Sequence, residues 1–162
     1  MIRRTRSIAV LLVLLTAACA SSSGGEGASS GEFEEQLGRV LYPPLQEAMD
    51  KILPKYRLAL RRSEEQFASL YYETEWMTRE VTAAEQAEGV TDARHRAIIS
   101  GRRVGETIDR VGEFRVTFTA QNQVRSQAEP AWHPAPGPEA FFDFWEEVYN
   151  DLRLEVATGV RR

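Results

Sequence analysis

The chain has 162 residues, of which 43% are hydrophobic and 27% are charged, and its formal net charge at pH 7 is −4. This composition is typical of a folded globular protein and excludes a disordered chain or a multi-span membrane protein. Three of its 20 basic residues and none of its 24 acids lie in residues 1–18, so the rest carries 17 bases and a net charge of −7, which disfavours nucleic-acid binding.

The first 18 residues have the three-part layout of an export signal. Three arginines precede an uninterrupted apolar core at residues 8–15, and small residues follow it. The apolar stretch through Ala18 is 11 residues long, about 16 Å as a helix, which is too short for the ~30 Å hydrocarbon core of a bilayer. We therefore predict that residues 1–18 are a cleaved signal peptide.

The end of this segment resembles the lipobox of bacterial lipoproteins. It reads Leu15-Thr16-Ala17-Ala18-Cys19 and contains the only cysteine of the chain. The resemblance implies that the Cys19 thiol receives a diacylglyceryl group, that cleavage makes Cys19 the first residue of the mature protein, and that acyl chains such as palmitate anchor it to a membrane. The alternative is a plain secretory signal with an incidental cysteine, which would leave a free thiol in an oxidising compartment.

The residues after the cysteine predict how the domain is held. By the same resemblance, Ala20 in place of an aspartate implies sorting to the outer membrane, facing the periplasm, if the bacterium has two membranes. Residues 19–31 form the lipidated cysteine and a tether rich in serine and glycine, whose flexible part has a root-mean-square reach of about 17–20 Å. Residues 32–162 are long enough for one domain with its own core, which we expect close to the bilayer in the cell envelope.

The first half of this domain predicts helices followed by strands. Helical spacing of apolar residues over 33–41 and 44–53 predicts two short helical pieces, broken at Tyr42-Pro43-Pro44. Alternation of apolar and polar residues then predicts four strands, over residues 56–61, 68–77, 95–100 and 114–121. Two assignments are possible for the core-facing side of the third strand. It is formed either by His95, Ala97 and Ile99 or by Arg96, Ile98 and Ser100.

The remaining signals concern the connections and the C-terminal helix. Thr82 and Glu85 are spaced as a capping box and Gly89 suits a helix end, which predicts a short helix between the second and third strands. Four prolines make residues 126–138 an extended connection, and an amphipathic helix follows from Pro138. The predicted fold is α+β: a four-stranded antiparallel sheet, ordered as a meander, with the N-terminal and C-terminal helices packed on one face.

This layout, with Thr74-Glu75-Trp76 on the second strand, resembles the helix-grip domains of BamC-type outer-membrane lipoproteins. The resemblance implies a fold in which helices embrace an antiparallel sheet. Because a fold does not determine a function, it transfers no functional residues to this chain.

Catalytic signatures are missing from the sequence, so we expect a protein that is not an enzyme. His95 and His133 have no nucleophile or acid at a telling spacing, and Glu73 and Glu75 are expected to form a strand face paired with arginines rather than a glycosidase site. With one cysteine and two histidines, we also expect no metal, no cofactor and no disulfide.

The candidate partner contacts are Trp132, Arg94 and Arg96. Trp132 lies in the proline-rich connection, where it serves either as an exposed anchor or as a cap over the loop and core. The arginines either contact anionic lipid or polymer, or form cross-strand ion pairs. We therefore predict a membrane-anchored accessory or adaptor lipoprotein that binds another envelope protein. A binding module for an apolar ligand beneath Phe141 and Trp145 is the alternative, and an envelope hydrolase is a third.

Overall fold

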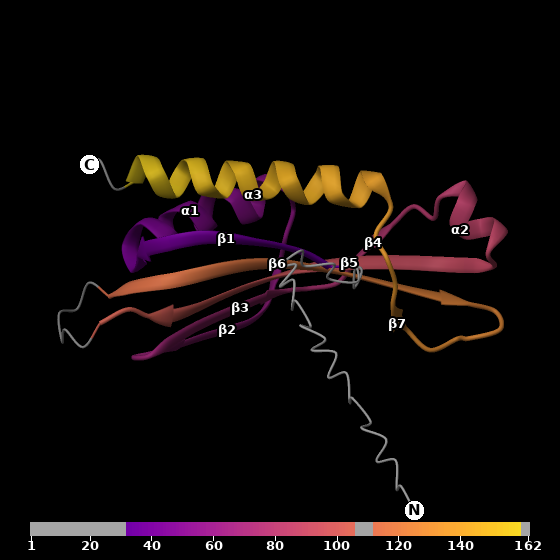
Figure 1. Ribbon diagram of the computed structural model, residues 1–162, viewed down its shortest axis with the longest axis horizontal. Helices are drawn as coiled ribbons and strands as arrows, with labels where there is room; N and C mark the ends of the chain where they lie inside the picture. Colours follow the sequence, from indigo (N-terminus) through magenta and orange to yellow (C-terminus); the bar gives the residue numbers. More distant parts are fainter. Residues whose placement is uncertain (1–31, 106–111, 160–162) are drawn as a thin grey trace, which may run out of the picture.

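The computed structural model describes residues 32–105 and 112–159, so the predicted signal peptide, Cys19 and the tether lie outside the described residues. The described part is an α+β fold with a sheet of seven strands and three helices (Figure 1). In chain order the elements are β1 (Glu32–Leu41), α1 (Tyr42–Lys55), β2 (Leu60–Gln66), β3 (Ser69–Thr74), β4 (Met77–Arg79), α2 (Ala83–Ala87), β5 (Val90–Arg103), β6 (Glu113–Ser126), β7 (His133–Pro134) and α3 (Glu139–Gly159).

The strands pair antiparallel in the order β1-β6-β5-β3-β2, while the short β4 and β7 pair with β5 and β6, respectively. Four consecutive long strands, β2, β3, β5 and β6, are neighbours in chain order, as the predicted meander requires. The prediction of only four strands is nevertheless too low, because β1, β4 and β7 extend the same sheet.

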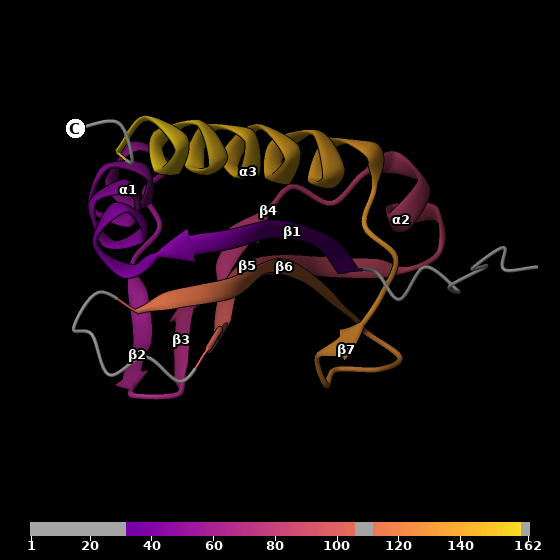
Figure 2. The same cartoon turned by 60° about the vertical axis from the view of Figure 1, so that its left-hand side comes forward.

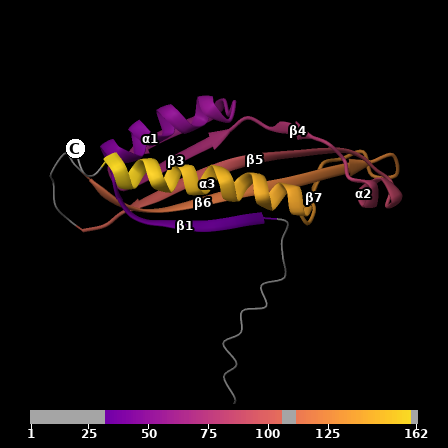
Figure 3. The same cartoon turned by 90° about the horizontal axis from the view of Figure 1, so that it is seen from above.

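Both long helices lie on one face of this sheet, as predicted (Figures 1 and 2). Seen from that side, α3 runs along β6 and β1 with α1 beside it (Figure 3). Ion pairs of Lys51 with Glu155 and of Lys55 with Asp151 join the two helices along their outer surfaces. Their apolar faces and the inner face of the sheet enclose the core, which has Trp145, Phe118 and Phe141 among its largest fully buried side chains.

The prediction of a helix over residues 33–41 is wrong, since these residues form β1. A β-bulge between Gln36 and Gly38 explains the misleading spacing. A bulge inserts one extra residue and so reverses the alternation of faces, which lets Phe33 and Val40 share the core side although they are seven positions apart, an odd spacing. Gly38 has φ +80°, a backbone conformation that glycine adopts without strain.

The predicted strand over residues 56–61 is displaced by several residues, because α1 continues to Lys55 and β2 begins at Leu60. The polar run 62–66, which lies between the first two predicted strands, belongs to β2, an edge strand whose side chains are mostly exposed. The second predicted strand divides at Glu75 and Trp76 into β3 and β4.

Other sequence signals are confirmed by the structure. The Thr82–Glu85 capping box forms at the start of α2, and Gly89 lies beyond its end with φ +87°. The inner face of β5 is the one that carries His95, Ala97 and Ile99. The helix expected from Pro138 is α3, which begins at Glu139.

Candidate functional site

The two faces of the sheet differ in cover and in chemistry. One face carries α1, α3 and the core, whereas no helix of the described residues covers the opposite face, which we call the helix-free face (Figures 1 and 2). Because successive side chains of a strand point to opposite faces, the helix-free face of β5 and β6 receives the residues that alternate with the core positions. It is therefore polar, and it carries Arg94, Arg96, Arg102, Arg115 and Arg125.

Three of these arginines alternate with two tryptophans in a continuous stack. The Arg125 guanidinium lies 4.8 Å from the centre of the Trp132 ring, and the Arg94 guanidinium lies 4.2 Å from the same ring. Arg94 and Arg96 each lie 4.3 Å from the Trp76 ring. We call these five residues the arginine–tryptophan stack. All the distances are within the range of favourable cation–π contacts.

The short strands explain how the two tryptophans reach this face. The pairing of β4 with β5 sets Met77 opposite His95 on the core side and Thr78 opposite Arg94 on the helix-free side. Trp76, one residue before Met77, therefore also lies on the helix-free side. The pairing of β7 with β6 sets His133 opposite Val124, which draws the preceding residue, Trp132, over the stack.

Hydrogen bonds fix the orientation of each arginine in the stack. Arg94 donates from Nε and Nη2 to the side-chain oxygen of Gln123, at 3.1 and 2.7 Å. Arg96 donates to Gln121 at 2.9 Å and forms an ion pair with Glu73. Arg125 donates to Asp92 at 3.0 Å, and this bond lowers the pKa of the Asp92 carboxyl.

Partial burial lowers the pKa of Arg94 and Arg96, with nearby arginines adding to the effect. An arginine with a lowered pKa still stays protonated, because its ordinary value is above 12. The charge of Arg94, unlike that of Arg96, is not offset by a bonded carboxylate, since its side-chain partner, Gln123, is uncharged. The centre of the stack is therefore a cation in a fixed position, to which no carboxylate of the described residues is bonded.

The three residues predicted as partner contacts thus lie together in the structure. Trp132 is half-buried over the sheet and stacks on Arg94, while Arg96 contacts the next ring. The alternative of cross-strand ion pairs holds for Arg96, which meets Glu73, but Arg94 bonds to an amide. Sequence reasoning missed Trp76 and Arg125, because their part in the stack depends on strand register.

The space beneath α3 is filled by side chains. Trp145 is fully buried and donates from Nε1 to Nδ1 of His95 at 3.1 Å, and the rings of Phe118, Phe141 and Phe144 surround this pair. Burial, with a smaller effect of Arg79, lowers the pKa of His95 to about 4. This packing gives no support to an apolar ligand beneath Phe141 and Trp145.

The side chains considered for hydrolysis lie in different surroundings. His95 is in the core, whereas His133 lies 3.8 Å from Glu129 in the connection before α3. Glu73 is buried in its ion pair, while Glu75 is exposed. Over residues 32–105 and 112–159, no group of three or more histidine, cysteine or carboxylate side chains is placed to hold a metal ion.

Among the described residues, no helix combines the length and apolarity needed to cross a membrane. No protein-family model matches the chain, and a comparison with curated proteins finds no match. The arginine–tryptophan stack on the helix-free face is therefore the candidate site that the geometry defines.

Proposed function

We propose that the protein is a non-enzymatic lipoprotein of the bacterial cell envelope, anchored by acyl chains on Cys19, and that it acts as an adaptor by binding another envelope protein. The observation that carries the proposal is the arginine–tryptophan stack. It lies on the face of the sheet that α1 and α3 leave open (Figure 1), and we infer that it is the partner-binding surface.

The chemistry of the stack supports this role. Tryptophan and arginine are the side chains most enriched among residues that dominate the binding energy of protein interfaces. Here their positions are fixed beforehand, because Gln121 and Gln123 hold the arginines and the arginines hold the rings. Fixed side chains lose less conformational entropy when a partner binds, so more of the contact energy appears as affinity.

The anchor follows from the lipobox resemblance at Leu15 to Cys19. Each buried methylene contributes about 0.8 kcal/mol, and more than one acyl chain is needed for stable attachment. The test is to supply cells with a labelled fatty acid and to compare the natural chain with Cys19→Ala. We expect label on the natural chain alone, and label retained by Cys19→Ala would refute acylation at this residue.

The partner is tested by affinity capture after chemical crosslinking in cells. Replacement of an interface anchor typically costs 2 kcal/mol or more, about a 30-fold loss of affinity, so Trp132→Ala should lose its co-purified envelope protein. Phe67→Ala is the matched control, because Phe67 is an exposed aromatic residue outside the stack (65% exposed). Equal recovery with both variants would contradict the proposed surface.

A further inference from the structure

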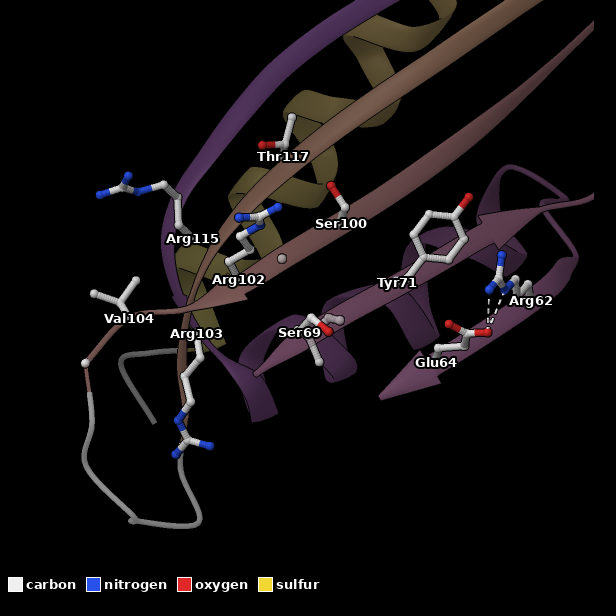
Figure 4. A pocket seen from close by; sticks show the side chains of 13 residues that line it. Arg62, Glu64, Ser69, Tyr71, Ser100, Arg102, Arg103, Val104, Arg115 and Thr117 are labelled. Atoms are coloured by element: carbon white, nitrogen blue, oxygen red, sulfur yellow. Dashed lines mark hydrogen bonds and ion pairs between the residues drawn. The ribbon is translucent and has the colours of Figure 1, made fainter. Parts of the chain in front are cut away.

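A second feature of the helix-free face lies at the end of the sheet where β5 finishes and β6 begins. It is an open groove of about 860 Å³ between β2, β3, β5 and β6 (Figure 4). This volume is within the range of small-molecule sites, which is roughly 300–1,000 Å³. The residues of the arginine–tryptophan stack do not line it, so it is a separate site.

Arg102 and Arg115 line the groove, and with Arg39, which lies beside it, they are like charges in register on three strands. Arg39 of β1 pairs directly with Arg115 of β6, and Arg115 pairs directly with Arg102 of β5. Arginines opposite one another on neighbouring strands destabilise a sheet. Among the described residues, none of the three forms an ion pair, in contrast to Arg96 and Arg125 of the stack. We call them the arginine row.

The arginine row borders a row of hydroxyl groups. Tyr71 of β3 pairs with Ser100 of β5, and Ser100 pairs with Thr117 of β6. All three side chains line the groove, and Arg102 lies over the strands on the same side as Ser100 and Thr117 (Figure 4). Arg115 points outward, away from Arg102 (Figure 4), as expected for two cations with no anion between them.

We propose that this groove binds a phosphate ester carried on a hydroxyl-rich body, such as a glycerol or sugar phosphate. Arg102 and, once its side chain turns toward Arg102, Arg115 would contact the phosphate oxygens, and Ser100 and Thr117 would donate hydrogen bonds beside them. A carboxylate has one charge and is satisfied by a single arginine, whereas a phosphate monoester carries a charge of about −1.5 to −2 and three acceptor oxygens. The site therefore matches the phosphate better than the carboxylate. The groove is also larger than a bare phosphate requires, and its hydroxyl wall suits a polar body.

This proposal goes beyond adaptor function, because it involves different residues and does not require acylation. The test is titration calorimetry of the full chain in neutral detergent with sn-glycerol 3-phosphate, at constant ionic strength. Arg102→Gln and Arg115→Gln should each weaken binding about tenfold or more, since each removes a charge-assisted hydrogen bond. Arg153→Gln is the matched control, because Arg153 is exposed on α3 and outside the groove.

The melting temperature distinguishes a loss of binding from a loss of folding in Arg102→Gln. Removing one of two facing like charges should leave the melting temperature of Arg102→Gln unchanged or higher. Arg102→Lys should recover part of the lost affinity, because it restores the charge without the two-pronged geometry of the guanidinium. Equal affinity of the natural chain and Arg102→Gln, or affinity for glycerate equal to that for glycerol phosphate, would overturn the proposal.

The phosphate ester is either a lipid head group or a soluble molecule, and competition between phosphatidic acid and glycerol phosphate distinguishes the two. The protein is mixed with phosphatidylcholine vesicles that contain or lack phosphatidic acid, whose head group is a phosphate monoester. Weaker binding of glycerol phosphate in the presence of phosphatidic acid would identify a lipid head group as ligand. Unchanged binding would identify a soluble phosphate ester as the ligand. Absence of glycerol phosphate binding to the natural chain, both in detergent and with vesicles, would overturn the proposal.

Discussion

The buried histidine beneath α3 makes the stability of the fold depend on pH in a predictable way. Nδ1 of this residue, His95, accepts the hydrogen bond from Nε1 of Trp145, so the imidazole ring is neutral and its proton is on Nε2. Burial lowers the pKa of His95 from 6.5 to about 4. The unfolded chain therefore binds a proton more readily than the folded protein at every pH between these values.

The sign and size of the effect follow from this difference. The contribution of neutral, buried His95 to the free energy of unfolding is complete above pH 6.5, and it is lost as the pH falls toward 4. At about 1.4 kcal/mol per pKa unit, protonation of His95 should lower the free energy of unfolding by about 2–3 kcal/mol between pH 7.5 and pH 4.5.

Urea unfolding at both pH values measures this loss in the natural chain and in His95→Gln. Glutamine keeps an acceptor for Trp145 but does not titrate. The carboxyls of Glu85, Asp92 and Asp151, whose pKa values are lowered by ion pairs, act equally in both proteins and cancel in the comparison. The natural chain should lose about 2–3 kcal/mol more than His95→Gln, and identical losses would refute a neutral buried histidine.

Three further substitutions test local features by urea unfolding at pH 7.5. Thr82→Ala removes the cap of α2 and should cost about 1 kcal/mol, and no cost would mean that the capping box does not stabilise the helix. Gly89→Ala places a side chain at φ +87° and should cost about 1–2 kcal/mol, so an unchanged stability would contradict that backbone conformation. Glu73→Gln leaves Arg96 without its carboxylate and should cost about 2 kcal/mol, whereas a neutral result would show that the ion pair contributes nothing.

The sequence predicted those elements whose signals are local. The box at Thr82 and Glu85, the proline before α3 and the apolar stripe of that helix all depend on residues within a few turns of one another, and the structure confirms them. Local patterns failed where the pairing of strands decided the outcome. The bulge before Gly38 gave β1 the apolar spacing of a helix, and β2, a mostly exposed edge strand, has no alternation of apolar residues to detect.

The candidate site was predictable in composition but not in geometry. Trp132, Arg94 and Arg96 stood out as residue types that anchor interfaces, yet nothing local placed a loop tryptophan beside a strand arginine. That contact arises because β7 pairs with β6 and brings Trp132 across the strand. The arginine row likewise depends on the registers of three strands that are distant in sequence.

Site-specific photocrosslinking in cells tests most directly whether the helix-free face is the binding surface. Thr78 is the position for the probe, because it is exposed and lies opposite Arg94 while leaving the whole stack intact. Leu154 on α3 is the control position, at 62% exposure on the helix-covered side. The account predicts a crosslinked envelope protein from the probe at Thr78 that is lost with Arg94→Gln and absent from the probe at Leu154. Only monomer from Thr78, or the same product from both positions, would contradict it.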